Sequence, residues 1–106
     1  MKNGYKVPWH IRQYVKAELM EYKNNVKLIK ACKGSSRAIL LTQIRLDKIN
    51  AVLESLNKED RDVTEIIFFD KYTQAGAETA KCVSKAMYYN TMNKVIYLVA
   101  KEMELI

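Results

Sequence analysis

Apolar side chains recur three and four positions apart through most of this chain, and little in the sequence interrupts a helix. Only one proline and three glycines occur in 106 residues, so long helices can form and a fold with many tight turns is disfavoured. With 49% hydrophobic residues the chain can also bury a core. The sequence therefore predicts an all-α fold of about five helices with short connections.

The first predicted helix is long and basic. It begins at Trp9, after Pro8, which fits the first turn of a helix because its missing N–H costs nothing there. Continued to about Lys33, this helix would be roughly 37 Å long. Met1–Val7 before it is predicted to be a flexible segment. One apolar face runs along the helix: Ile11, Val15, Leu19, Tyr22, Val26 and Ile29.

The second predicted helix runs from about Arg37 to Leu56. The segment Lys33–Ser36 supplies a glycine stop for the first helix and a serine N-cap for the second. Leu40 and Ile44 lie roughly opposite the main apolar face, so this helix is either central in its domain or pairs with another chain. Self-association through that side is one candidate. The main face contains Ile39, Thr42, Leu46, Ile49, Leu53 and Leu56.

A third helix is predicted to begin after the N-cap Asn57 and to end near Asp70. Its inward residues are expected to be Val63, Ile66, Ile67 and Phe69. Residues 8–56 would then form an N-terminal helical hairpin, in which the long basic helix pairs with the second helix. Residues 57–106 would form a helix-turn-helix domain.

The last third of the chain has the layout of a helix-turn-helix, in which the second helix enters the DNA major groove. A short helix over Thr73–Lys81 precedes Ser84, whose hydroxyl can cap the helix that follows. Placing Tyr88, Met92, Val95, Val99 and Met103 inward leaves a polar face outside. The predicted DNA-binding residues are Ser84, Lys85, Ala86, Tyr89, Asn90, Asn93, Lys94 and Tyr97.

These residue types suit DNA recognition. Asparagine can make a paired contact with adenine, alanine or a tyrosine ring can meet a thymine methyl group, and lysine can reach phosphate or guanine. No acidic residue occurs between Lys85 and Lys101. The alternative is an ordinary amphipathic helix whose asparagines and tyrosines face water.

Positive charge is concentrated at both ends of the chain, whose net charge is +6. Eight basic and two acidic residues over 1–33 give +6, five and seven over 34–70 give −2, and five and three over 71–106 give +2. Such ends suit a polyanion, most commonly nucleic acid, or simply a solvated surface. Candidate phosphate contacts on the first helix are Lys16, Lys23, Lys27 and Lys30. That helix could also lie on an anionic membrane, but matching apolar faces on the first two helices favour burial within the protein.

No residue pattern indicates catalysis, a cofactor or a metal. His10 is the only histidine and has no nucleophile or carboxylate arranged with it, and no glycine-rich phosphate loop occurs. The acidic cluster Glu59–Asp62 is explained by a helix start. Cys32 and Cys82 are predicted to be reduced, mostly buried thiols. The longest apolar runs are too short to cross a bilayer. We therefore expect a cytoplasmic protein that is not an enzyme, requires no cofactor or metal, and has no membrane partner.

Several segments resemble a known family. Leu46–Ile49, Leu56–Arg61 and Ile66–Thr73 look like the segment preceding the helix-turn-helix of sigma-factor region-four-like proteins. Val83–Tyr89 is similar to the start of their recognition helix. Together with Glu18–Lys23 in a long basic helix, these segments resemble the RinA/ArpU-type late-gene transcriptional regulators of phages and prophages of Gram-positive bacteria.

This resemblance covers residues 9–106, with one difference in the turn before Ser84. The family's apolar positions fit best if that turn is one residue longer, with Ala77 and Ala80 facing the recognition helix. Cys82 and Val83 would then plug the core.

The preferred function is that of a sequence-specific DNA-binding transcriptional regulator. The resemblance implies a late-gene activator that contacts RNA polymerase in the cytoplasm of a bacterial host. One alternative is a DNA-binding structural protein of phage packaging, similar to a small terminase subunit. Another is a helical protein-interaction module that does not bind DNA. The expected partners are double-stranded DNA and, as candidates, RNA polymerase and a second copy of the chain.

Overall fold

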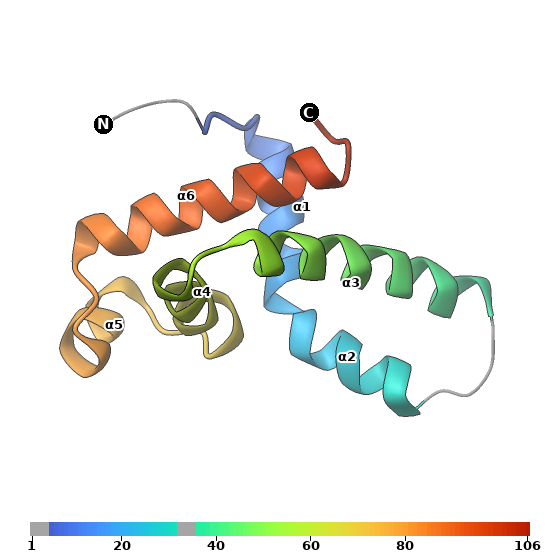
Figure 1. Ribbon diagram of the computed structural model, residues 1–106, viewed down its shortest axis with the longest axis horizontal. Coiled ribbons are helices and arrows are strands. Elements are labelled where there is room, and N and C mark those ends of the chain that lie inside the picture. Colours follow the sequence, from blue (N-terminus) through green and yellow to red (C-terminus); the bar gives the residue numbers. More distant parts are fainter. Residues whose placement is uncertain (1–4, 32–35) are drawn as a thin grey trace.

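The computed structural model describes residues 5–31 and 36–106, and every regular element in them is a helix (Figure 1). No strand occurs in these residues, which confirms the predicted all-α class. No described helix is long and apolar enough to cross a membrane. The helices are α1 (Trp9–Met20), α2 (Tyr22–Ala31), α3 (Arg37–Ser55), α4 (Lys58–Thr64), α5 (Gln74–Lys81) and α6 (Lys85–Glu102), with a π-helical turn η1 (Glu65–Phe69) after α4.

The core lies where α1 and α6 cross and where η1 and the second half of α3 meet them. Both of the predicted parts, 8–56 and 57–106, contribute to this one core. Since the largest buried side chains come from elements throughout the chain (α1, α3, α4, η1 and α6), their packing fixes the tertiary arrangement. The largest side chains that are almost completely buried are Phe68, Leu19, Ile49, Ile67, Ile96, Val15, Val95, Val99 and Thr64.

The predicted single helix from Trp9 to Lys33 is wrong, because the chain bends at Glu21 between α1 and α2. Neither proline nor glycine occurs at the bend. The two halves have different partners: α1 packs on α6 and η1, whereas α2 packs on α3. Tyr22, directly after the bend, stacks on Phe69 with ring centroids 4.7 Å apart and donates a hydrogen bond to Asn50 Oδ1. We attribute the bend to these partners.

The third predicted helix also divides, into α4 and η1. At its end the Asp70 N–H donates to the Glu65 carbonyl over 2.7 Å, a bond that spans five residues and widens the turn. This extra residue per turn rotates the side chains, so Phe68 is fully buried and Phe69 lies at the edge of the core. Val63 and Ile67 are buried and Ile66 and Phe69 pack against the core, as predicted, but the pattern did not indicate Phe68.

The N-caps proposed for α3 and α4 are confirmed. Ser36 accepts a hydrogen bond from the Ile39 N–H over 3.3 Å, and Asn57 accepts one from the Asp60 N–H over 2.8 Å. The glycine stop before α3 and Cys32 lie outside the described residues. At the start of the chain, Val7 packs against the core and the Tyr5 ring lies 5.3 Å from that of Tyr97, so the end of the predicted flexible segment is held on the protein.

Candidate nucleic-acid interface

A three-residue turn, Cys82–Ser84, joins α5 to α6, as in a helix-turn-helix. α5 ends when Cys82 takes the left-handed conformation, φ 57°, in the position where glycine is usual. The Ala77 carbonyl accepts hydrogen bonds both from the Cys82 N–H and, over 3.2 Å, from the Val83 N–H. The direction of the backbone thus changes within three residues, and the N–H groups of Cys82 and Val83 are satisfied by α5 itself.

Both helices of this unit begin at capping side chains. Ser84 accepts a hydrogen bond from the Met87 N–H over 3.1 Å, as predicted, and Thr73 accepts one from the Gly76 N–H over 3.1 Å. A cap of this kind is worth about 1 kcal/mol. It fixes the residue at which α6 starts, and therefore fixes which side chains of the first two turns point outward.

Three side chains hold the start of α6 on the protein. Ala77 of α5 is fully buried and lets the two helices approach closely, and Val83 is buried in the turn. Tyr88 is buried as predicted, and its hydroxyl donates to the Tyr72 carbonyl over 2.8 Å. Burial, together with the neighbouring Tyr89, raises the pKa of Tyr88 above its usual value of 10.0.

Two residues assigned to this packing are not part of it. Cys82 and Ala80 are exposed, so the predictions of a buried thiol and of a second packing alanine are wrong. A left-handed residue at the end of α5 turns its side chain away from the helix axis, and the next residue, Val83, fills the core instead.

The first two turns of α6 present an open face without negative charge. Ser84, Lys85, Ala86, Tyr89 and Asn90 are exposed, and Asn93 one turn later is half-buried. The first acidic residue of the helix is Glu102, in its last turn. Since the positive end of the helix dipole lies here as well, this face favours an anion. It offers amide, hydroxyl, methyl and ammonium groups within two turns.

Lys94 and Tyr97, further along α6, have partners within the protein. The Lys94 ammonium lies 2.7 Å from Asp60 Oδ2 of α4, and this hydrogen-bonded pair raises the pKa of Lys94 above its usual 10.5 despite partial desolvation. Tyr97 contacts the Tyr5 ring and has the Lys101 ammonium 6.0 Å above its own ring. The face of α6 that remains open for a ligand therefore ends near Asn93.

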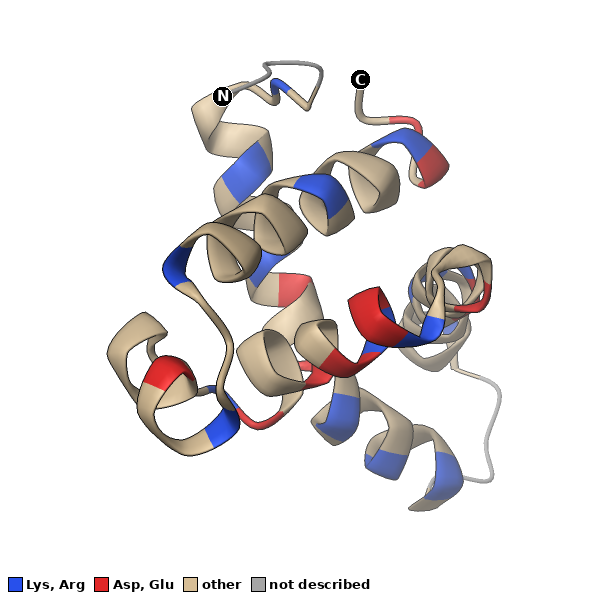
Figure 2. Cartoon of the chain, turned by 60° about the vertical axis from the view of Figure 1, so that its left-hand side comes forward, with Lys and Arg blue, Asp and Glu red and all other residues tan. Residues whose placement is uncertain are grey.

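The four predicted phosphate contacts on the first helix lie elsewhere. Lys16 is half-buried on α1, whereas Lys23, Lys27 and Lys30 are exposed on α2. In Figures 1 and 2, α2 lies away from the start of α6, with α4 and η1 between them. Lys23 also pairs with Asp70 at 3.4 Å. The structure therefore separates the basic residues into two groups instead of one continuous patch.

Two basic residues beside α6 were not singled out in the sequence. Lys71 precedes Tyr72, whose carbonyl is bonded to Tyr88, and Lys81 is exposed in the last turn of α5, with its ammonium 5.5 Å from the Tyr72 ring. Lys71 takes a left-handed conformation, φ 58°. Each lies two or three residues before a capping residue, Thr73 or Ser84, which was the available signal in the sequence.

A shallow depression of about 620 Å³ adjoins the other side of the turn. Its lining includes Glu59, Asp62 and Lys81, so it mixes charges of both signs. Among the residues that the structure describes, no cluster of three or more histidine, cysteine, aspartate or glutamate side chains could hold a metal ion. Comparisons of the chain with protein-family models, curated proteins and solved structures gave no match.

Proposed function

We propose that the protein binds double-stranded DNA in a sequence-specific manner, with the first two turns of α6 in the major groove. The observation that carries this proposal is the capped three-residue turn between α5 and α6, followed by an exposed face free of acidic residues. A solvated terminal helix needs neither a fixed starting residue nor such a uniform absence of negative charge.

The proposed contacts follow from the chemistry of that face. Asn90 and Asn93 are spaced to read adenine edges, and Ala86 and Tyr89 offer apolar surface for thymine methyl groups. Lys85, with Lys81 at the end of α5 and Lys71 before α5, would contact phosphates and fix the register on the duplex. Lys94 and Tyr97 are left out of this set because their side chains are engaged within the protein.

The finer role follows from the resemblance to RinA/ArpU-type regulators. On that basis we propose a late-gene transcriptional activator that contacts RNA polymerase in a bacterial host. DNA binding and activation are separate claims, since the first depends on α6 and the second on a surface that meets the polymerase.

The experiment is selection of preferred duplexes from a random pool, followed by affinity measurements on selected and scrambled DNA. Asn90→Ala should cost about 1–3 kcal/mol on the selected duplex and much less on scrambled DNA. Asn24→Ala is the matched control, because Asn24 is an exposed asparagine of α2 whose side chain bonds only to Glu21 among the described residues. Equal losses for Asn90→Ala on both duplexes would contradict base reading.

Ser84→Asp tests the start of the helix independently. Aspartate caps as well as serine, so the variant should keep the melting temperature of the parent, while its charge repels phosphate and DNA binding is lost. A variant that folds and binds DNA as the parent does would show that α6 does not enter the groove there. Failure of the parent to bind any duplex at low salt would favour a protein-interaction module. A ring-shaped assembly on DNA would favour a packaging protein.

A further inference from the structure

The first half of α3 carries large apolar side chains that the protein leaves uncovered. Leu40, Leu41 and Ile44 are 53%, 43% and 51% exposed on consecutive turns. Their neighbour α2, which packs on another side of α3, contains no buried residue at all. Single exposed leucines need no explanation, but a contiguous apolar stripe on a helix marks a contact surface.

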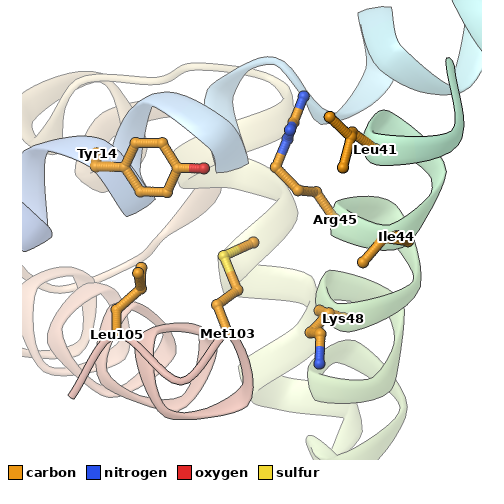
Figure 3. A pocket seen from close by; sticks show the side chains of 7 residues that line it. All are labelled: Tyr14, Leu41, Ile44, Arg45, Lys48, Met103 and Leu105. Carbon is orange, nitrogen blue, oxygen red and sulfur yellow. The ribbon is translucent and has the colours of Figure 1, made fainter. Parts of the chain in front are cut away.

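The stripe borders a groove of about 220 Å³ that runs between α3 and the other helices. Figure 3 shows Tyr14, Met103 and Leu105 on one side of this groove, facing Ile44 and Lys48 on the other. Tyr14 and Leu105 are themselves partly exposed. One face of the protein therefore presents a ridge, formed by Leu40, Leu41 and Ile44, beside a hollow. Leu41 and Ile44 also form one wall of that hollow, together with Arg45 and Lys48.

A ridge next to a hollow is the arrangement that a two-fold symmetric pair can use twice. In such a pair the same patch serves both partners, and if residue i of one copy meets residue j of the other, then j also meets i. The ridge of each copy would enter the hollow of the other. An unrelated partner could bind with either the ridge or the hollow alone.

The charges of α3 are arranged for the same symmetry. Two antiparallel copies of a helix place residues at equal distances from the axis opposite each other. With the axis at the level of Thr42, but on the opposite, exposed side of the helix, Leu40 meets Ile44 and Arg37 meets Asp47 of the other copy. Both charged residues are exposed, and neither forms an ion pair with another described residue. Opposite charges thus lie about 7–8 Å along the helix on either side of the axis.

We propose that a second copy of this chain docks on this face, with the two α3 helices antiparallel. Leu40 and Ile44 form the apolar centre, and Arg37 and Asp47 form an ion pair at each end. The proposal concerns α3 and does not depend on whether α6 binds DNA. If both hold, the pair presents two reading helices to two half-sites.

The test is the mass in solution, measured by light scattering and sedimentation while the concentration is raised. The parent chain should approach twice its 12.3 kDa mass. Ile44→Asp buries a charge at the centre and should raise the dissociation constant more than about tenfold. Leu28→Asp, which makes the same kind of replacement at a partly exposed apolar residue of α2, should leave the dissociation constant unchanged. Circular dichroism checks that every variant stays helical.

Charge reversal distinguishes this pairing from any other contact. Arg37→Glu and Asp47→Arg alone each place like charges opposite one another at both ends, so each should shift toward monomer. Mixing the two variants should restore the dimer as a heterodimer, because both ends are then complementary. The double variant Arg37→Glu/Asp47→Arg should dimerise by itself.

Three results would overturn the proposal. One is a parent that remains a monomer at the highest concentration reached. Another is a dimer that Ile44→Asp leaves intact, which would place the contact elsewhere. The third is a folded pair of single variants that do not associate on mixing, which would exclude the antiparallel register.

Discussion

The body of the protein and the projection formed by α2 and the first half of α3 are built from similar residues but packed very differently. The body consists of α1, the second half of α3, α4, η1, α5 and α6, and its apolar side chains at the crossing of α1 and α6 are inaccessible to water. In the projection, α2 buries no residue and α3 buries only Thr42 before Leu46. In Figure 1 these two helices extend away from the other elements.

Stability and available binding surface lie in different parts of the molecule. Burial of apolar area is the main favourable term in folding, so the body supplies most of the stability. The projection keeps apolar and basic side chains in water, where they contribute little to folding but remain available to a partner. The start of α6 is an intermediate case, because its inner side is anchored by Tyr88 while its outer side is open.

The largest effect should come from one substitution made on both sides of the bend at Glu21. Leu19→Ala removes a fully buried side chain of α1 and should lower the free energy of unfolding by about 2–5 kcal/mol. Leu28→Ala removes one from α2 that is 44% exposed, and should cost less than about 1 kcal/mol. Urea denaturation measures both. Equal losses of unfolding free energy for the two variants would contradict this difference, because the projection would then be as well packed as the body.

A second prediction asks which of the two basic groups meets DNA. Replacing Lys81 and Lys85 by glutamine should lower the slope of log affinity against log salt by about two, since each lysine releases about one counterion. Replacing Lys27 and Lys30 in the same way should leave the slope unchanged, because α2 lies away from the start of α6. Titrations at several salt concentrations give the slopes. A change with the α2 pair would support the sequence-based assignment of phosphate contacts to the first helix.

The smallest effect concerns the contribution of the Lys94–Asp60 pair to the free energy of unfolding at high pH. The pKa of Lys94 is raised in the folded protein by its bond to Asp60, so the folded state holds this proton more tightly than the unfolded chain does. The resulting stability is present below the usual pKa of 10.5 and is lost as pH rises through the raised value. Lys94→Met should therefore reduce the fall in unfolding free energy between about pH 10 and 12.

The control for that prediction is Lys23→Met, which removes an exposed lysine 3.4 Å from Asp70. Because an exposed pair contributes little, the free energy of unfolding of this variant at neutral pH should stay close to that of the parent. Burial raises the pKa of Tyr22 and of Tyr88, so these tyrosines also lower the free energy of unfolding as the pH rises. This contribution is the same in every variant. Identical curves for Lys94→Met and the parent would show that the ion pair of the body contributes no pH-dependent stability.

The sequence determined the features that arise within one or two turns of chain. The all-α class follows from periodicity, and Ser36, Asn57 and Ser84 cap helices because a side-chain oxygen two or three residues from a free N–H is sufficient. The inner side of α6 was also predictable, since Tyr88, Met92, Val95 and Val99 repeat at helical spacing and all are buried.

Features that depend on residues distant in the sequence could not be predicted from it and are set by the tertiary structure. The apolar pattern runs through Glu21 without a break, and the bend exists because α1 and α2 pack on different helices. The π turn at Glu65–Phe69 buries Phe68 completely, although the pattern did not place it inward. Asp60, 34 residues before Lys94, removes that lysine from the open face of α6. A local pattern records which side of a helix is apolar, but not which other helix covers it, and that choice is made by the packing of the whole core.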